Sequence, residues 1–274
     1  MVLHPRGTDI RDPVELSIRQ FIDAWQVICA KSPSSAVVAA DGVQYVFSGI
    51  PIAFFNIALP TGRDITADTL RTHARAACEF ASRHNVPWFF VVTQEGLAPG
   101  TDAAAVLDSC GLAPIMPLTG MLAERVAPAT TVPAGLELTV ADDDDGFSAV
   151  IDVNAIAYDM ELDASKPLIG RRAFWTDHVA VLGTTGGKPA SSAAVLMVDG
   201  RRYVALVATD PGQQRRGYAE AAMRRALEHA AALHGERPTV LHATAAGRPI
   251  YARMGYETIA NHSVFMEKRF LSAH

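Results

Sequence analysis

The sequence predicts an α/β protein made of two halves that share one order of strands and helices. Short apolar runs alternate with longer amphipathic segments along the chain, which is typical of α/β domains. The order strand, long helix, strand, short helix occurs once in each half. Between the halves, residues 127–135 read "APATTVPAG", a composition typical of a linker.

In the first half, two segments carry apolar residues at helical spacing, and strand-like runs lie between them. Asp41-Gly42 separates two such runs and is typical of a tight hairpin turn. Thr66 or Asp68 can cap the long helix, and Asp102 the short one. The predicted elements are a helix at 14–30, strands on both sides of 41–42, a strand at 54–60, a helix from about 66 to 84, a strand at 86–92, a short helix at 101–112 and a closing segment at 114–126.

The second half repeats this order. Gly186-Gly187 and Asp199-Gly200 predict hairpin turns. The acidic run at 142–145 precedes a helix, so we interpret its carboxylates as caps that complement the helix dipole. The predicted elements are a strand at 136–142, a helix at 146–160, strands at 178–183 and 192–210, a helix at 217–234, a strand at 238–244, a short helix at 247–255 and strand-like residues at 257–270.

Composition restricts the classes of partner and location. The net charge of −5 over 274 residues gives no general attraction to nucleic acid or to an anionic membrane. The three cysteines are widely spaced and form no C-x-x-C pair, which is typical of reduced thiols in a cytoplasm. Residues 1–16 lack the apolar core of a signal peptide, and the most apolar region, at 45–60, is too short and interrupted to span a membrane.

The strand that follows the Asp199-Gly200 turn and ends at Asp210 leads into a second turn, which has the features of an anion site. Residues 214–219 lie between this strand and a helix start, where main-chain N–H groups and the helix dipole favour an anion such as pyrophosphate. Gly217 lets the main chain approach the phosphates, and Arg215 and Arg216 offset their charge. The alternative is a solvated loop with two incidental arginines.

A second pattern, Tyr-Ala-Arg-Met-Gly-Tyr at 251–256, follows the turn by about 40 residues. Together the two patterns resemble the motifs of the GNAT superfamily of N-acetyltransferases. The first family motif, a strand ending in V-x-P or D-P and then Q/R-x-x-G-x-G/A, is matched at 207–211 and 214–219. The second, Y-x-x-x-G-F/Y, is matched at 251–256. The resemblance covers about residues 204–257.

The resemblance implies two tandem GNAT-like domains, each with a mixed central sheet flanked by helices. We expect a degenerate domain at 1–130 and a catalytic domain at 134–274. When the two halves are aligned, Leu107 falls opposite Tyr251, and residues 61–68 fall opposite the glycine-marked turn. The first half therefore lacks both motifs.

The resemblance also implies an activity, the transfer of an acetyl group from acetyl-CoA to a primary amine without a metal. Tyr251 would point at the thiol sulfur and donate a proton to the departing thiolate, although a core tyrosine with one hydrogen bond fits the pattern too. Thr244 stands where the family often has asparagine, which leaves one cofactor hydrogen bond open. The implied cofactor-binding residues are Val207, Ala208 and Thr209 through their main chain, then Gln214, Arg215, Arg216, Gly217, Tyr218 and Ala219 at the pyrophosphate, and Thr244.

Several points stay open in the sequence. The base that takes the amine proton is Asp159, Glu161, Asp163 or His242, or ordered water, and each of these side chains fits a structural role as well. We expect a small-molecule amine as acceptor and neither nucleic acid nor membrane as partner, with a homodimer as one option for the oligomeric state. The alternatives are acetylation of a protein amino terminus or lysine, and a regulatory module that binds acetyl-CoA without catalysis.

Overall fold

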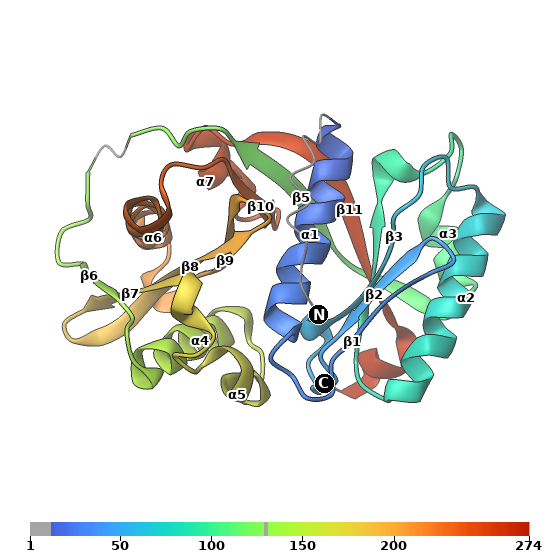
Figure 1. The fold of residues 1–274 in the computed structure, drawn as a ribbon, viewed down its shortest axis with the longest axis horizontal. Helices are drawn as coiled ribbons and strands as arrows, with labels where there is room; N and C mark the ends of the chain where they lie inside the picture. Colours follow the sequence, from blue (N-terminus) through green and yellow to red (C-terminus); the bar gives the residue numbers. More distant parts are fainter. Residues whose placement is uncertain (1–11, 129–130, 274) are drawn as a thin grey trace. The chain divides into compact units, whose positions relative to one another are not determined.

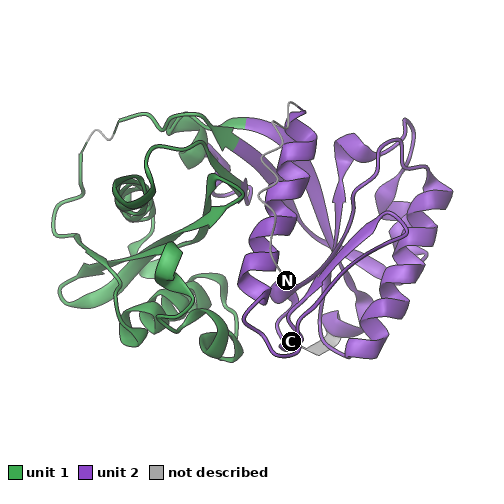
Figure 2. Ribbon diagram, in the orientation of Figure 1, with its two compact units in different colours: residues 1–8, 122–241, 250–257 green, residues 9–121, 242–249, 258–274 purple. Residues whose placement is uncertain are grey.

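The computed structural model describes residues 12–128 and 131–273. These residues form two compact units, shown in separate colours in Figure 2. Of the described residues, unit 1 contains 122–241 and 250–257, and unit 2 contains 12–121, 242–249 and 258–273. Each unit therefore combines stretches from both halves of the sequence.

The expected division into domains at 1–130 and 134–274 stays a prediction. The expected absence of a signal peptide falls largely on residues 1–11, which lie outside the described residues. Residues 129 and 130 of the expected linker lie outside them too.

Unit 2 is a mixed sheet with helices on both faces, α1 on one side and α2 and α3 on the other (Figure 1). Its strand order is β1-β2-β3-β4-β11-β5. The helices are α1 (Pro13–Cys29), α2 (Ala67–His84) and α3 (Ala103–Asp108), and the strands are β1 (Ala36–Ala40), β2 (Val43–Phe47), β3 (Asn56–Pro60), β4 (Phe89–Thr93), β5 (Leu112–Ala123) and β11 (Glu257–Glu267).

Small side chains let α2 pack closely on this sheet. Ala74, Ala77 and Ala81 recur at helical spacing, and all three are fully buried. They share a core with Trp88 and with alternate residues of β2, which include Tyr45. The periodicity seen in the sequence therefore marks the true inner face of this helix.

The three predicted hairpin turns are confirmed. In each, two consecutive residues have a positive φ, as a type I′ turn requires, and glycine takes the second position because it adopts this conformation without strain. The turns join β1 to β2, β7 (Val179–Thr185) to β8 (Lys188–Val198), and β8 to β9 (Arg201–Thr209). Their residues are Asp41 and Gly42, Gly186 and Gly187, and Asp199 and Gly200.

Unit 1 contains a run of five strands, covered by α4 on one face and α6 on the other (Figure 1). Its strand order is β10-β9-β8-β7-β6, in which β9 and β10 are parallel. The strands are β6 (Glu137–Val140), β7 (Val179–Thr185), β8 (Lys188–Val198), β9 (Arg201–Thr209) and β10 (Thr239–Ala243), and the helices are α4 (Asp144–Tyr158), α5 (Lys166–Ile169), α6 (Tyr218–His234) and α7 (Arg248–Arg253). The last two residues of β10 and the first two of α7 are assigned to unit 2.

The acidic run before α4 acts as the sequence predicts. Asp143 caps the helix by accepting a 2.8 Å hydrogen bond from the N–H of Gly146. Asp144 accepts from the main-chain N–H of Arg172 and from the Arg171 guanidinium, and both bonds lower the pKa of its carboxyl. The helix starts at Asp144, two residues earlier than expected, because the run supplies both cap and first turn.

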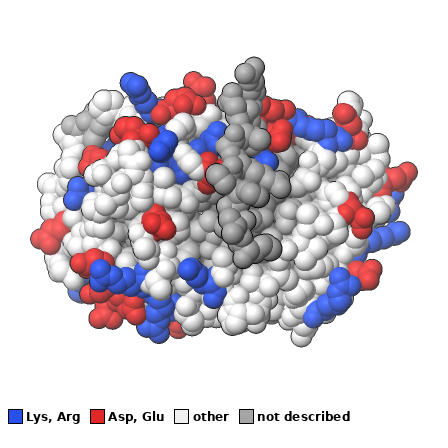
Figure 3. All heavy atoms as spheres, in the orientation of Figure 1, with Lys and Arg blue, Asp and Glu red and all other residues white. Residues whose placement is uncertain are grey.

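Acidic and basic side chains are interspersed on the face drawn in Figure 3, without a broad region of one sign. This distribution agrees with the small net charge of −5. Across residues 12–128 and 131–273, every helix is too short or too polar to cross a bilayer.

Candidate active site

A bulge in β9 prepares the strand that precedes the glycine-marked turn. Ala205 pairs with Ala194 of β8, and Ala208 with Ser192, so Leu206 and Val207 have no partner residue in β8. Leu206 adopts a positive φ of 51°, which is unusual for a branched side chain. An extra residue of this kind twists a strand and redirects its main-chain groups.

Side chains from α4 and β8 take up the carbonyl groups that the bulge frees. The Leu206 carbonyl accepts from Ser192 Oγ at 2.9 Å and from Asn154 Nδ2 at 3.3 Å. The Val207 carbonyl accepts from the Tyr158 hydroxyl at 2.8 Å. Asn154 and Ser192 are almost fully buried, so the bulge is held from within the core.

The pairing between β9 and β10 ends early. Thr239 pairs with Arg202 and Val240 with Tyr203, and the register stops there. Residues 204–209 therefore form the part of β9 that could accept an added strand, and the predicted cofactor contacts of Val207, Ala208 and Thr209 fall in this part.

The turn after β9 leads to a helix start without a side-chain cap. Asp210 folds back to accept from the N–H of Gly212 at 2.8 Å, and residues 214–217 are exposed. Gly217 takes the cap position of α6 with φ of +80°, and within the described part of the chain no side chain caps this helix start. The N–H groups of Tyr218 and Ala219 therefore point from the positive end of the helix dipole.

The two predicted arginines and Tyr218 take different positions. Arg215 and Arg216 are exposed on the turn, and Arg215 has a positive φ of 63°. The Tyr218 side chain is buried against Leu136 and Ala190, so it anchors the helix start while its main chain stays at the turn.

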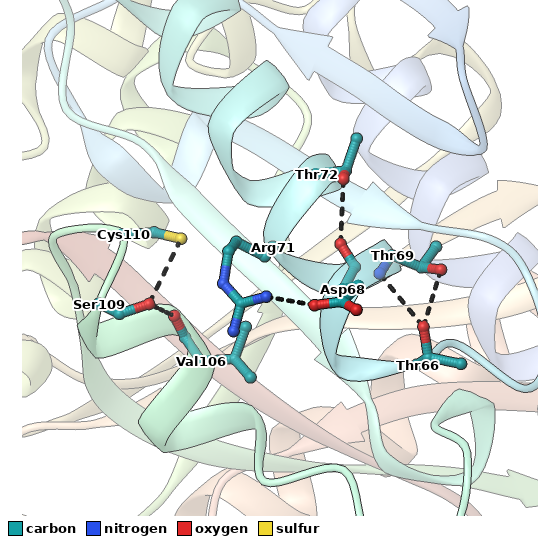
Figure 4. Close-up of polar contacts among 8 residues, drawn as sticks. All are labelled: Thr66, Asp68, Thr69, Arg71, Thr72, Val106, Ser109 and Cys110. Carbon is teal, nitrogen blue, oxygen red and sulfur yellow. Dashed lines mark hydrogen bonds and ion pairs between the residues drawn. The ribbon is translucent and has the colours of Figure 1, made fainter.

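Unit 2 has the corresponding strand, turn and helix without these features. β3 pairs with β2 in unbroken register, so it has no bulge. Figure 4 shows that α2 starts with a cap, because Thr66 Oγ1 accepts from the N–H of Thr69, and Asp68 in its first turn pairs with Arg71. A capped helix start with a carboxylate is unsuited to an anion.

Beyond the paired residues of β3 and β4, the segments that follow these two strands are joined by main-chain hydrogen bonds. Ile65 forms a parallel bridge with Leu97. The Ile65 N–H donates to the Gly96 carbonyl at 3.0 Å, and the Ala98 N–H donates to the Ile65 carbonyl at 3.0 Å. The main-chain N–H and carbonyl of Ile65 are therefore already paired within the chain.

Tyr251 lies on α7, and only 9% of its surface is exposed. Burial raises the pKa of its hydroxyl, with smaller electrostatic contributions from Tyr158 and Tyr256. A phenol with a raised pKa keeps its proton at neutral pH, so the donor form is fully populated, while its driving force for proton transfer is smaller than that of a free phenol.

The rest of the second motif fixes α7. Gly255 follows the helix with φ of +93°, a conformation that favours glycine. The Tyr256 hydroxyl hydrogen-bonds Thr239 Oγ1 at 2.9 Å, which ties the motif to β10. The spacing of tyrosine and glycine in this motif is therefore a structural requirement as well as a chemical one.

Thr244 and His242 belong to unit 2. Thr244 Oγ1 accepts from the N–H of Gly247 at 3.3 Å and so helps to begin α7. His242 Nε2 lies 3.0 Å from Ser17 Oγ, and burial holds the pKa of this histidine well below its ordinary value.

The three candidate carboxylates after α4 differ in their pairing. Asp163 forms an ion pair with Lys166, which also binds Asp152. Asp159 and Glu161 are exposed and form no ion pair within the described parts of the chain. Asp159 ends α4 with a positive φ of 51°. Neither the base nor the other site residues are tested by this geometry, so their roles stay predictions.

Residues 177–271 match the family model described as "Acetyltransferase (GNAT) domain". The chain contains a GNAT acetyltransferase domain. The match includes the bulged strand, the turn, α6 and the second motif. Comparison with curated proteins finds no significant match.

Solved structures show that the whole chain has the fold of tandem GNAT proteins. A GCN5-related N-acetyltransferase from Kribbella flavida is 19% identical, with a TM-score of 0.67 over 93% of this chain and 95% of the other. A tandem GNAT protein from the clavulanic acid biosynthesis pathway is 15% identical, with a TM-score of 0.53 over 96% of each chain. A GCN5-related N-acetyltransferase from Sphaerobacter thermophilus is 14% identical, with a TM-score of 0.56 over 93% and 92%.

Sequence reasoning missed Asn154, Ser192 and Tyr158, which hold the bulge of β9. Asn154 lies on the helix face that also carries Phe147 and Ile151, and a polar residue on an apolar face is a usable signal. Tyr158 continues this face by one turn. Ser192 carries no such signal, because its role depends on the bulge in the neighbouring strand.

Proposed function

We propose that the protein is an acetyl-CoA-dependent N-acetyltransferase that acts on a primary amine of a small molecule. One observation carries the proposal, namely the uncapped start of α6 at Gly217 directly after the bulged strand β9. The orphan N–H groups of such a helix start bind phosphate well. The capped start of α2 shows that the fold alone does not require this arrangement.

The residues present fit coenzyme A. Among the described residues, a Cβ at Gly217 would meet Pro133 alone, at 3.5 Å, so the main chain of the turn is open toward them. Arg215 and Arg216 are exposed beside it and can offset phosphate charge. The cofactor supplies an acetyl group activated as a thioester, and the free edge of β9 would align its pantetheine arm.

Acetyl transfer requires a neutral amine and a proton donor. The amine nitrogen forms a bond to the acetyl carbon, and the carbon–sulfur bond breaks with its electron pair on sulfur. Tyr251 gives its proton to that sulfur, and the proton released by the nitrogen passes through a base or water and restores the tyrosine. Thiol and amide are the products, so atoms and charge balance.

The cysteines support direct transfer from thioester to amine. A covalent acyl-enzyme would need a reactive thiolate. Cys29 and Cys78 are unpaired, and burial raises the pKa of each thiol to about 12. Their reduced state also agrees with a cytoplasmic location, which we include in the proposal.

The test combines cofactor binding with thiol release. Ala219→Asp places at the second residue of α6 the carboxylate that Asp68 provides in α2. We expect it to weaken coenzyme A binding at least about tenfold by calorimetry without loss of thermal stability, since an acidic residue suits a helix start. The matched control is Asp68→Ala, which should leave coenzyme A binding unchanged.

Thiol release from acetyl-CoA is then measured with small amines, a lysine peptide and a peptide with a free amino terminus. Release with small amines alone supports the proposal. Release with the peptides only would favour the protein acetyltransferase alternative, and tight binding without release would favour the regulatory module. Unchanged binding by Ala219→Asp would overturn the placement of the phosphates.

A further inference from the structure

Tyr158 is the side chain from which we infer the chemical class of the acceptor amine. It is the last residue of α4, and its hydroxyl donates to the Val207 carbonyl at 2.8 Å. This bond fixes one end of the ring on the part of β9 that the proposed function assigns to pantetheine. Because this hydrogen bond fixes the hydroxyl end of the side chain, the ring keeps one orientation at the surface.

Half of the Tyr158 surface is nevertheless exposed, at 50%. Most aromatic side chains of unit 1 are buried, for example Phe147, Trp175 and Tyr203. The apolar ring therefore remains open beside the carbonyl that it binds. An exposed aromatic face next to a reaction site is a surface for an apolar ligand group or for a cation.

Tyr158 also lies near the candidate proton donor. The electrostatic influence of Tyr158 contributes to the raised pKa of Tyr251, after the larger effect of burial. Both side chains belong to unit 1. A group that rests on the open face of Tyr158 therefore lies beside Val207, on the part of β9 that the proposed function assigns to pantetheine.

The residues that follow the tyrosine have a mixed apolar and acidic character. Met160 is 36% exposed, which is high for methionine in a folded chain. Asp159 and Glu161 flank it and form no ion pair within the described residues, whereas Lys166 neutralises Asp163. The segment thus combines an apolar surface with uncompensated negative charge, which attracts an ammonium and repels a carboxylate.

We propose that the acceptor is a primary amine attached to an apolar chain or ring, without a carboxylate next to the amine, and that its apolar part rests on Tyr158. This inference depends on the proposed N-acetyltransferase function and narrows its substrate class. Apolar contact with the ring and Met160 gives affinity. The negative charge of the segment selects against amino acids.

The experiment compares amines that differ in one feature. 2-Phenylethylamine carries the apolar ring, phenylalanine adds a carboxylate, and ethanolamine lacks the apolar part. We expect kcat/KM in thiol release to be at least about tenfold higher for 2-phenylethylamine than for either of the others. Calorimetry of 2-phenylethylamine with the coenzyme A complex measures binding independently of turnover.

Variants of Tyr158 test whether the preference for an apolar amine depends on this side chain. Tyr158→Ala and Tyr158→Phe both lose the hydrogen bond to Val207, but only the alanine variant loses the ring, so Tyr158→Ala should raise KM for 2-phenylethylamine at least about fivefold more than Tyr158→Phe does. Tyr158→Phe keeps the ring and loses the bond to Val207, so it should keep the order of preference, and it is informative even if the alanine variant folds poorly. Ile156→Ala is the matched control, because Ile156 is 58% exposed on the same helix but two residues away, on a different face.

The outcomes separate this inference from the function on which it rests. Equal kcat/KM for phenylalanine or ethanolamine, or a loss in Tyr158→Ala that is the same for every amine, overturns the inference and leaves the acetyltransferase function standing. Absence of thiol release with every amine overturns the proposed function. In that case, binding of 2-phenylethylamine that is lost in Tyr158→Ala still supports the surface, and absence of binding rejects it.

Discussion

In unit 2, Ser17 Oγ lies 2.9 Å from Nε2 of His262, in the buried interior between α1 and β11. The same hydroxyl is 3.0 Å from Nε2 of His242, and Nδ1 of His262 is 3.0 Å from Thr93 Oγ1. The two contacts of Ser17 require α1 to lie close to the sheet. Gly120 of β5 makes this approach possible because it has no side chain.

We predict that Gly120→Ala destabilises the protein. An added Cβ would lie 2.0 Å from Ser17 Oγ, so α1 or the serine would have to move. The free energy of unfolding should fall by roughly 1–3 kcal/mol, as for other overpacked cores. Urea denaturation measures it.

Gly62→Ala provides the control, since its Cβ would meet Ile65 at an ordinary 3.7 Å and Gly62 has no positive φ. Equal effects of the two substitutions would show that the contact with Ser17 does not control the packing of α1.

We predict that stability falls as the pH drops below about 6.5, through the buried histidines. Burial lowers the pKa of His262 to about 4, from an ordinary 6.5, and lowers that of His242 too. Between these values the unfolded chain binds a proton that the folded chain does not, so stability is full above pH 6.5 and is lost as pH falls toward 4. At 1.36 kcal/mol per pKa unit, His262 accounts for roughly 3 kcal/mol.

Chemical denaturation at a series of pH values checks this effect. His262→Gln should reduce the slope of unfolding free energy against pH between 4 and 6.5, whatever its effect at pH 8. A slope that is the same in the variant and in the original protein would exclude His262 as the source.

We predict that the bulge of β9 depends on Asn154. Asn154→Leu removes one donor from the Leu206 carbonyl and leaves Ser192 as the other. Because Ser192 still satisfies the carbonyl, the cost is that of the lost hydrogen bond, roughly 0.5–1.5 kcal/mol. Coenzyme A affinity should fall as well, because Val207 follows directly.

Thermal unfolding and calorimetry measure the two effects of Asn154→Leu. Ser82→Ala, which removes an exposed hydroxyl bonded to the Glu79 carbonyl, should change neither. Weaker stability with unaltered coenzyme A binding would separate the bulge from the cofactor site.

We predict that Tyr251→Phe lowers kcat while it leaves coenzyme A binding within about twofold. General acid catalysis contributes roughly 10²–10⁴ in rate, so kcat should fall at least about 100-fold. The control is Tyr256→Phe, which loses the bond to Thr239 and should reduce stability more than kcat. Unchanged turnover in Tyr251→Phe would remove this residue as the proton donor.

Local features of the fold could be predicted from the sequence because they depend on local chemistry. Thr66, Asp102 and Asp143 cap helices, and Asp41-Gly42 turns a hairpin, since each needs only its neighbours. Phe54 and Phe55 were expected in a strand, but they enter a short 3-10 helix, Ala53–Phe55. Their apolar run does not distinguish a buried strand from a buried turn of helix.

Long-range pairing and the bulge could not be predicted in this way. β11 lies in antiparallel register with β4, where Phe265 pairs with Phe90. An apolar strand pattern states which face is buried but not which strand is the neighbour. The bulge at Leu206 could not be predicted for the same reason. It is recognised only when the residues of β9 are compared with those opposite them in β8.

The bridge between Ile65 and Leu97 bears on attempts to build a second active site into this chain. Transplanting the sequence of the glycine-marked turn onto residues 61–68 would replace side chains and the cap, but it would leave the hydrogen bonds of Ile65 with Gly96 and Ala98 in place. Those bonds join main chain to main chain, so no exchange of side chains removes them. An engineered two-site enzyme would need a shortened or rerouted loop after β4 before any new turn could meet a cofactor.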